Sequence, residues 1–205
     1  VGLNIKNVSF QLALFKEKTL VGVGRSWTAL KGSGDQLAFV GLPGITVEGN
    51  NLNVAINIAA SDKSSIDFVK TKTDLGVTIG RPDTAVLDMA GITGGSIAAS
   101  GQVKLRAFDF FYADATLVFE RGSSTVTLTK DANNDGQADT VQVDTLTIGA
   151  LDVTAFVGIN GGSADEMGFK IDNVDFAMLT MVEHGVTPAT ARTWSSLKAT
   201  ADSVG

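Results

Sequence analysis

The sequence predicts an all-β protein: an antiparallel meander that forms an elongated β-sandwich or a solenoid-like repeat unit. Many short segments alternate apolar and polar residues, which is the pattern of half-buried strands. The 23 glycines punctuate these segments, and no window sustains a helical period with capping residues at its ends. A nine-residue segment near the start also returns near the end. We expect roughly a dozen strands, with at most one or two short helical turns.

The repeated segment is the strongest signal in the sequence. Residues 2–10 (GLNIKNVSF) return as residues 168–176 (GFKIDNVDF), with Gly, Ile, Asn, Val and Phe identical in register. A second block follows each copy, RSWTALK at residues 25–31 and RTWSSLK at residues 192–198. The offset is 166 residues in the first block and 167 in the second, which indicates a one-residue gain in the loop between them. Two blocks in the same order at nearly the same offset indicate an internal duplication.

This duplication sets the predicted domain organisation. Residues 1–167 are interpreted as one complete repeat unit, and residues 168–205 as the opening strands of the next. The second matched block is either a strand or a short turn, and it contains both tryptophans of the chain, Trp27 and Trp194. We interpret these as packing residues, each with the arginine two positions earlier stacked on its ring or paired with a carboxylate.

Individual strands are predicted from alternation and from the turn residues between them. The clearest strand is residues 51–58, in which Leu, Val and Ile alternate with Asn and Ala. Its asparagine-bearing face is expected to be wet or to form a side-chain ladder. Residues 49–51 are predicted as a turn, and Gly149 as a break between strands at 146–148 and 153–157.

Composition limits the kind of function. Of the 205 residues, 44% are hydrophobic and the mean hydropathy is +0.20, which favours a folded chain. The formal net charge is -6 and the basic residues are not clustered, so binding to nucleic acid is disfavoured. The absence of cysteine excludes disulfides and thiolate metal sites. No apolar run approaches the roughly 18 residues of a membrane span. Because the sequence starts and stops inside the repeat pattern, we expect it to be a piece of a longer protein.

The clearest chemical motif is an oxygen-rich loop at residues 131–139, DANNDGQAD. It places oxygen-bearing side chains at positions 1, 3, 5 and 9, a glycine at position 6 and a backbone carbonyl at position 7, as in the first part of a calcium loop. The candidate metal ligands are Asp131, Asn133, Asp135, Gln137 and Asp139. The loop resembles those of EF-hands, dockerins and thrombospondin-type repeats, which implies Ca²⁺ as the bound ion. The alternative is a solvated hairpin tip that needs no ion.

The loop departs from an EF-hand in two ways. Gln142 stands at position 12, where an EF-hand has a bidentate glutamate, so a further carboxylate would come from elsewhere, with Asp144 as one candidate. The flanking segments are also predicted strands instead of helices. The expected role of the ion is therefore to stiffen a hairpin.

No catalytic residues are predicted. The single histidine, His184, lies in a loop that has no histidine in the first copy, and we interpret it as an ordinary surface residue. The chain lacks cysteine and a Gly-x-Ser-x-Gly motif, which disfavours nucleophilic hydrolysis. Carboxylates such as Asp109 and Asp114 could in principle serve a glycosidase, but acidic residues at unspecified positions are too common to predict one. The protein is predicted to be non-enzymatic, with Ca²⁺ as its cofactor.

The order of the matched blocks, together with residues 146–162 (LTIGALDVTAFVGINGG), carries a family resemblance. The chain resembles tandem modules of very large bacterial exported proteins and is similar to calcium-dependent RTX-type adhesins and matrix proteins. The resemblance covers nearly all of residues 2–205. It implies an extracellular or cell-surface structural role.

These observations lead to one main functional hypothesis and three alternatives. The main one is a calcium-stiffened repeat module that joins adjacent repeats of the same protein head to tail, into a fibre or adhesin stalk. The first alternative is an adhesin module that binds carbohydrate, such as cell-surface or matrix glycans, through the asparagine face of residues 51–57 or through the aromatic run at 108–112. The second is an enzyme acting on polysaccharide. The third is a lipid-carrying β-groove, suggested by strands such as residues 12–15 that are apolar on both faces.

Overall fold

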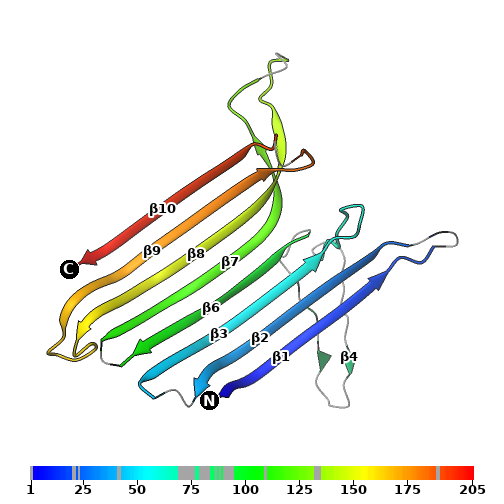
Figure 1. Cartoon of the computed structure of the whole chain (residues 1–205). Coiled ribbons are helices and arrows are strands. Elements are labelled where there is room, and N and C mark those ends of the chain that lie inside the picture. Colours follow the sequence, from blue (N-terminus) through cyan, green and yellow to red (C-terminus); the bar gives the residue numbers. More distant parts are fainter. Residues whose placement is uncertain are drawn as a thin grey trace.

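The predicted all-β antiparallel meander is confirmed (Figure 1). A computed structural model describes residues 2–19, 22, 24–40, 43–68, 77–78, 84–85, 87, 89, 95–108, 110–131, 135–187 and 190–205. Within these ranges there are ten strands and no helix. The main sheet contains, in spatial order, β1 (Gly2–Lys16), β2 (Ser26–Val40), β3 (Ile45–Ile58), β6 (Ile97–Ala107), β7 (Phe111–Thr127), β8 (Thr140–Ile159), β9 (Met167–Glu183) and β10 (Thr193–Val204). The strands β4 (Val77–Thr78) and β5 (Thr84–Ala85) form a separate two-stranded sheet.

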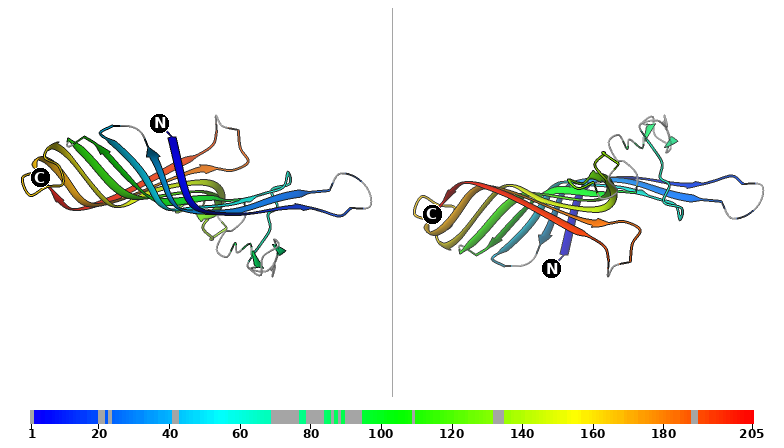
Figure 2. Two further views of the ribbon diagram at one scale, coloured as in Figure 1. Left: turned by 90° about the horizontal axis from the view of Figure 1, so that it is seen from below. Right: turned by 90° about the horizontal axis from the view of Figure 1, so that it is seen from above.

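The eight-stranded sheet is a single curved layer with β1 and β10 at its opposite edges (Figure 2). Few apolar side chains are buried, and the main core cluster lies where the segment after β3 returns over the sheet. There Leu87 and Met89, which are 5% and 1% exposed, pack on Ala29 of β2. The partly buried side chains around this cluster are Ala13, Phe15, Ala55 and Phe68.

Four asparagine or aspartate residues inside the strands adopt a left-handed backbone conformation. The φ angles are 50° at Asn7, 51° at Asn51, 53° at Asp152 and 50° at Asn173. Near Asn51 the register between β3 and β6 shifts, and near Asp152 the registers of β8 with both neighbours shift. At Asn51, Asp152 and Asn173 these are the marks of β-bulges, in which one extra residue bends the strand. At Asn7 the two strands stay in register and only the pairing of Asn7 with Asp35 is absent. Asn and Asp tolerate the required φ better than other residues with a side chain.

These bulges correct two of the sequence-based predictions. Residues 49–51 were predicted as a turn, but β3 runs through them from residue 45 to residue 58. Gly149 was predicted as a break, but it lies inside β8, a strand of 20 residues. Gly and Asn inside a strand at a bulge give the same sequence signal as a turn, so the pattern divided these two long strands; the described residues contain ten strands, against roughly a dozen expected.

These left-handed residues keep the apolar side chains of their strands on one face. Side chains two positions apart share a face of a regular strand, but across a bulge the spacing becomes three. A Cβ at Gly34 would lie 4.0 Å from side-chain atoms of both Ile5 and Val8, so these two residues are on the same face although three positions separate them. In β3, a Cβ at Gly49 would lie 3.2 Å from Leu52, again three positions away.

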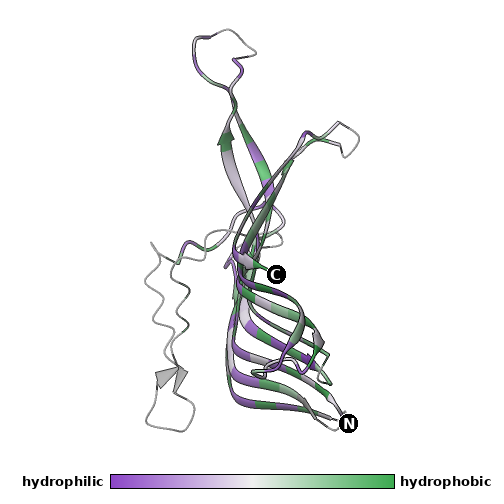
Figure 3. Cartoon of the chain, turned by 90° about the vertical axis from the view of Figure 1, so that its left-hand side faces the viewer, coloured by the Kyte–Doolittle hydropathy of each residue, from purple (hydrophilic) through white to green (hydrophobic). Residues whose placement is uncertain are grey.

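The result is a sheet with one apolar face and one largely polar face. The core cluster around Ala29 lies on the largely polar face, because Ala13 and Ser9 point to the same side of β1. Cross-strand partners share a face. One row of partners across all eight strands consists of Phe10, Gly32, Val54, Ala99, Phe119, Ile148, Met178 and Leu197. The adjacent row, on the other face, consists of Ser9, Ser33, Asn53, Ser100, Val118, Gly149, Ala177 and Lys198. Apolar and polar residues accordingly alternate along the strands in Figure 3.

The apolar face is not covered by a second layer within the described part of the chain. Phe10 and Leu14 at one edge are 72% and 74% exposed, and Leu197 at the other edge is 67% exposed. Such a large contiguous exposed apolar surface is unusual for a monomeric protein and marks an interaction surface.

The bulge at Asn173 gives a test of this architecture. Replacing Asn173 with Ala should lower the free energy of unfolding by about 1–2 kcal/mol, because a Cβ without a compensating polar group disfavours the left-handed conformation. Replacing it with Gly should cost less, because glycine adopts positive φ readily. Urea denaturation of the two variants measures the difference. Equal losses would mean that the 2.7 Å hydrogen bond from Asn173 to Asp202, which both variants lack, is the dominant contribution.

Candidate functional site

The hairpins β1–β2 and β9–β10 are structural copies of each other. In the first, Phe15 pairs with Trp27 and Leu12 with Leu30. In the second, Met181 pairs with Trp194 and Met178 with Leu197. The offsets of 166 residues for the first strand and 167 for the second reproduce those in the sequence. The internal duplication therefore extends from residue identity to strand register.

The bulges of the two hairpins match as well. Asn7 and Asn173 both have a φ of 50°. The Asn7 side-chain amide donates a 2.8 Å hydrogen bond to Asp35, and the Asn173 amide donates one of 2.7 Å to Asp202. Each bond joins the two strands of its hairpin at the one position where the backbone pairing is interrupted, so a side-chain contact replaces that pairing.

A Glu–Arg–Trp cluster closes the loop end of each hairpin. In the first cluster, Arg25 donates from Nε and Nη2 to the two carboxylate oxygens of Glu17, at 3.0 and 2.7 Å, and its guanidinium carbon lies 5.3 Å from the centre of the Trp27 ring. This bidentate geometry is the strong form of an Arg–carboxylate contact. Hydrogen bonds from Arg25 lower the pKa of Glu17 from 4.5 to about 2.

The second cluster has the same geometry. Arg192 donates to the two oxygens of Glu183 at 2.8 and 2.6 Å, and its guanidinium carbon lies 5.5 Å from the centre of the Trp194 ring. Hydrogen bonds from Arg192 lower the pKa of Glu183 to about 2. The interpretation of both tryptophans as packing residues beside a stacked and carboxylate-paired arginine is confirmed, although the two glutamates could not be identified from the sequence.

The first cluster has two further partners that come from the turn after β3. Arg25 Nη1 lies 3.2 Å from an Asp62 carboxylate oxygen, and the Trp27 indole N–H donates a 3.0 Å hydrogen bond to the Ser64 carbonyl. Hydrogen bonds from Ser64 and then from Arg25 lower the pKa of Asp62. The first hairpin is therefore tied to the chain beyond β3, on the side opposite its β1 edge.

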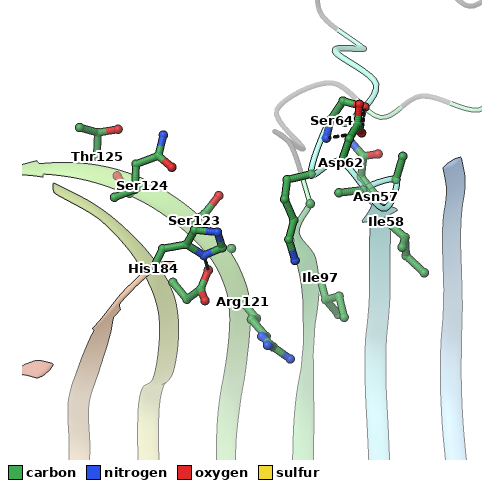
Figure 4. Close-up of a pocket in the computed structure, with 17 residues that line it drawn as sticks. Asn57, Ile58, Asp62, Ser64, Ile97, Arg121, Ser123, Ser124, Thr125 and His184 are labelled. Atoms are coloured by element: carbon green, nitrogen blue, oxygen red, sulfur yellow. Dashed lines mark hydrogen bonds and ion pairs between the residues drawn. The ribbon is translucent and has the colours of Figure 1, made fainter. Parts of the chain in front are cut away.

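A cavity of about 940 Å³ opens between the end of β3 and the β7–β8 region (Figure 4). Asn57, Asp62 and Ser64 line one side of it, and Arg121, Ser123 and His184 line the other. The lining is rich in hydroxyl and charged groups, so the cavity suits a polar ligand more than an apolar one.

Two residues of this cavity differ from the sequence-based expectation. His184 was interpreted as an ordinary surface residue; its side chain is 33% exposed, and the sequence did not predict that its Nδ1 lies 3.0 Å from an Asp144 oxygen. Asn57 was placed on a wet or ladder-forming face, but it is fully buried and donates a 2.9 Å hydrogen bond to the Ile66 carbonyl. Its buried side-chain oxygen has no hydrogen-bond partner among the described residues. Both contacts join residues from separate segments, which local pattern cannot reveal.

Of the predicted calcium loop between β7 and β8, Asp131 and residues 135–139 are described. The Asp131 carboxylate accepts hydrogen bonds from the backbone N–H groups of Asp135, at 3.3 Å, and Gly136, at 2.9 Å. An Asp135 oxygen accepts one of 2.8 Å from the Gln137 N–H, and Gly136 has a φ of 82°. The turn thus brings Asp131 and Asp135 together by side-chain capping of its own backbone.

The remaining predicted ligands of this loop are placed as follows. The Asp139 backbone carbonyl accepts a 2.7 Å hydrogen bond from Leu128, which begins the pairing of the two strands. Asn133 lies outside the described residues. Within the described ranges, no three acidic or histidine side chains are grouped closely enough to form a metal site. Ca²⁺ at this loop stays a prediction.

Comparison with family models, curated proteins and solved structures finds no significant match to this chain. In the part of the chain that the structure describes, no helix has the length and apolar character needed to cross a membrane. The features that bear on function are therefore the duplicated hairpins, the sheet edges and the two faces of the sheet.

The two Glu–Arg pairs predict an acid-sensitive stability. Because pairing lowers the folded-state pKa of Glu17 and Glu183 from 4.5 to about 2, the stabilisation is present above about pH 4.5 and is lost as the pH falls from there towards 2. The double variant Glu17→Gln, Glu183→Gln should melt lower than the parent at neutral pH and should lose less stability on acidification. Thermal unfolding across this range, followed by tryptophan fluorescence, measures both effects. Glu120→Gln, at an exposed glutamate outside the clusters, is the matched control, and an equal change in that variant would contradict the assignment.

Proposed function

We propose that this chain is one unit, with the opening hairpin of the next, of a non-enzymatic structural array in which a single antiparallel sheet continues from unit to unit. In this proposal residues 1–167 are the complete unit and residues 168–205 begin its successor. The observation that carries the proposal is the second hairpin, which repeats the first in register, in bulge geometry and in its Glu–Arg–Trp cluster. The extracellular bacterial setting, as a fibre or adhesin stalk, rests on the sequence resemblance.

The order of strands supports continuation of the sheet at both edges. The main sheet has eight strands, and without the two that repeat β1 and β2 each unit contributes six strands to it. Since β9 corresponds to β1 and pairs with β8, the free edge of β1 is where the β8 of a preceding unit would pair. Since β10 corresponds to β2, and β2 pairs with β3, the free edge of β10 is where the β3 of a following unit would pair.

Side-chain exposure along the first strand agrees with a missing neighbour. Val8 and Phe10 of β1 are 59% and 72% exposed, whereas their counterparts Val174 and Phe176 in β9 are half-buried beside β8. Long unpaired strands are templates for pairing, and proteins rarely leave them open. An array would cover both edges of every unit except at its two ends. This geometry favours the solenoid-like alternative of the predicted fold.

A second candidate function is favoured by the apolar face. The row from Phe10 to Leu197 and its neighbours on that face form a continuous apolar strip across all eight strands. In a longer array this strip would be a continuous path for acyl chains, which suits a lipid carrier. Mass spectrometry of an organic extract of the purified protein distinguishes this candidate, because a purely structural array would bring no stoichiometric lipid with it.

A tandem chain tests sheet continuation. Gly205 corresponds to Ala38, so residues 1–205 followed directly by a second copy of residues 39–205 should form two joined units. We expect this chain to unfold in one transition with a higher midpoint than the single chain, because nearest-neighbour interfaces add to the stability of each repeat. Scanning calorimetry measures the midpoint and the number of transitions. Two units that unfold independently at the midpoint of the single chain would contradict the proposal.

Calcium is the proposed stiffening ion of the β7–β8 hairpin, and it is tested separately. Millimolar Ca²⁺ should raise the thermal midpoint relative to chelator, by the mass-action stabilisation expected of a ligand that binds only the folded state. The variant Asp131→Ala, Asp135→Ala should abolish this rise. Glu120→Gln removes a carboxylate outside the loop and should keep it. A midpoint that does not respond to Ca²⁺ would identify the loop as a self-capped polar turn and remove the ion from the proposed function.

A further inference from the structure

We propose that the turn after β3 of the next unit closes each unit boundary. In the first cluster, Asp62 and Ser64 of this turn bind Arg25 and Trp27; the same turn of the next unit would bind Arg192 and Trp194 of the second cluster. The partner is thus a strand of the β3 type followed by an Asp-x-Ser turn. This inference rests on the proposed function, because the next unit supplies the closing turn. It goes further in assigning Arg192 and Trp194 a binding role across the boundary.

In the first cluster the closing turn is held in a form suited to this contact. One Asp62 oxygen accepts hydrogen bonds from the N–H and hydroxyl of Ser64, at 3.0 and 2.6 Å. The other oxygen faces Arg25 Nη1 at 3.2 Å. The Ser64 carbonyl accepts a 2.8 Å hydrogen bond from the Ala60 N–H as well as the bond from the Trp27 indole. One turn therefore supplies a carboxylate to Arg25 and a backbone carbonyl to Trp27.

The second cluster presents the same groups without that turn. Arg192 is fixed by Glu183, whose side chain is only 13% exposed, and stacks on Trp194. Asp139, the residue directly before β8, adds a longer-range electrostatic attraction to Arg192. On the other side the sheet ends at β10, and the Trp194 indole N–H makes no hydrogen bond within the described residues.

The surface beside the second cluster also matches. On the first hairpin, Phe68 packs edge-on against Phe15 at 6.2 Å between ring centres, and the same core cluster includes Ala13. The positions that correspond to Ala13 and Phe15 are Leu179 and Met181, which are apolar and half-buried. The next unit's segment would find an apolar surface there, next to the cation and the indole donor that its turn would engage.

The register of the expected contact follows from the first unit. There Leu30 pairs with Ile56 and Gly32 with Val54. Their counterparts Leu197 and Ala199 should pair with the same two positions of the incoming strand. Leu197, which is 67% exposed at the free edge, would then have a neighbour on each side as Leu30 does.

The test extends the chain by the closing segment alone. A copy of residues 39–68 is appended directly after Gly205, because Gly205 is the counterpart of Ala38. This copy contains no tryptophan. The extended chain therefore has only the two indole N–H signals of Trp27 and Trp194. Solvent exchange of the two indole N–H groups is measured by NMR in the parent and the extended chain, and Trp27→Phe assigns the signals. Trp27 should exchange slowly in both. Trp194 should exchange quickly in the parent and as slowly as Trp27 in the extended chain. A matched chain carries Asp62→Ala in the appended copy only, and its Trp194 should exchange faster than in the extended chain.

Backbone exchange in β10 separates the possible failures. If the β10 amides that do not face β9 become protected but the Trp194 indole still exchanges quickly, the closing contact is wrong while sheet continuation stands. If neither is protected, although Trp27 shows that the first hairpin is folded, both the closing contact and the proposed function are overturned. Protection of both supports the closing contact.

Discussion

Alternation of side chains across the strand is the constraint on which the rest of this structure depends. Strands of 15 to 20 residues, such as β1 and β8, must keep their apolar residues on one face over their whole length while the sheet twists and bends. The left-handed residue at Asn7, Asn51, Asp152 or Asn173 allows a local bend and resets the alternation. The sequence records this reset as a spacing of three in an otherwise two-residue pattern, as between Ile5 and Val8. The separation of the sheet into two chemically different faces follows from it.

The parts of the structure that depend on local pattern could be predicted from the sequence, and those that depend on tertiary contact could not. Alternation and the absence of a helical period were sufficient for the all-β meander, and duplication was visible because identical residues recur in register. The lengths of β3 and β8 were not predictable, because Gly and Asn at a bulge give the same signal as a turn. The partners Glu17 and Glu183 were missed because each pairs across a loop, 8 or 9 residues from its arginine, with no motif to mark it. The burial of Asn57 depends on the return of the chain at Ile66, which no pattern indicates.

The small core has a consequence for how this sheet is stabilised. Because few apolar side chains are fully buried, most of the favourable contact comes from neighbouring strands, through backbone hydrogen bonds and cross-strand side-chain pairs. Fully burying one side chain of the size of Phe10 would contribute about 1.5–3 kcal/mol to the free energy of folding. An edge strand without a neighbour lacks part of this stabilisation for each such residue. A sheet of this kind gains more stability from additional strands at its edges than from a second layer on its face. The predicted calcium loop follows β7, away from these contacts, so an ion bound there would affect stiffness locally.

The number of strands in the unit determines the direction of any assembly built from it. Six is even, and neighbouring strands are antiparallel, so β9 runs in the same direction as β1 (Figure 1). Successive units would therefore repeat without inversion, and every Glu–Arg–Trp cluster, every 940 Å³ cavity and every tip of the β7–β8 hairpin would lie along the same rim. The opposite rim would carry only the other set of loops. Such an array is a polar filament with two different rims and two different ends. It could be attached by one specific end, and it would present the same repeated rim to its surroundings along its whole length.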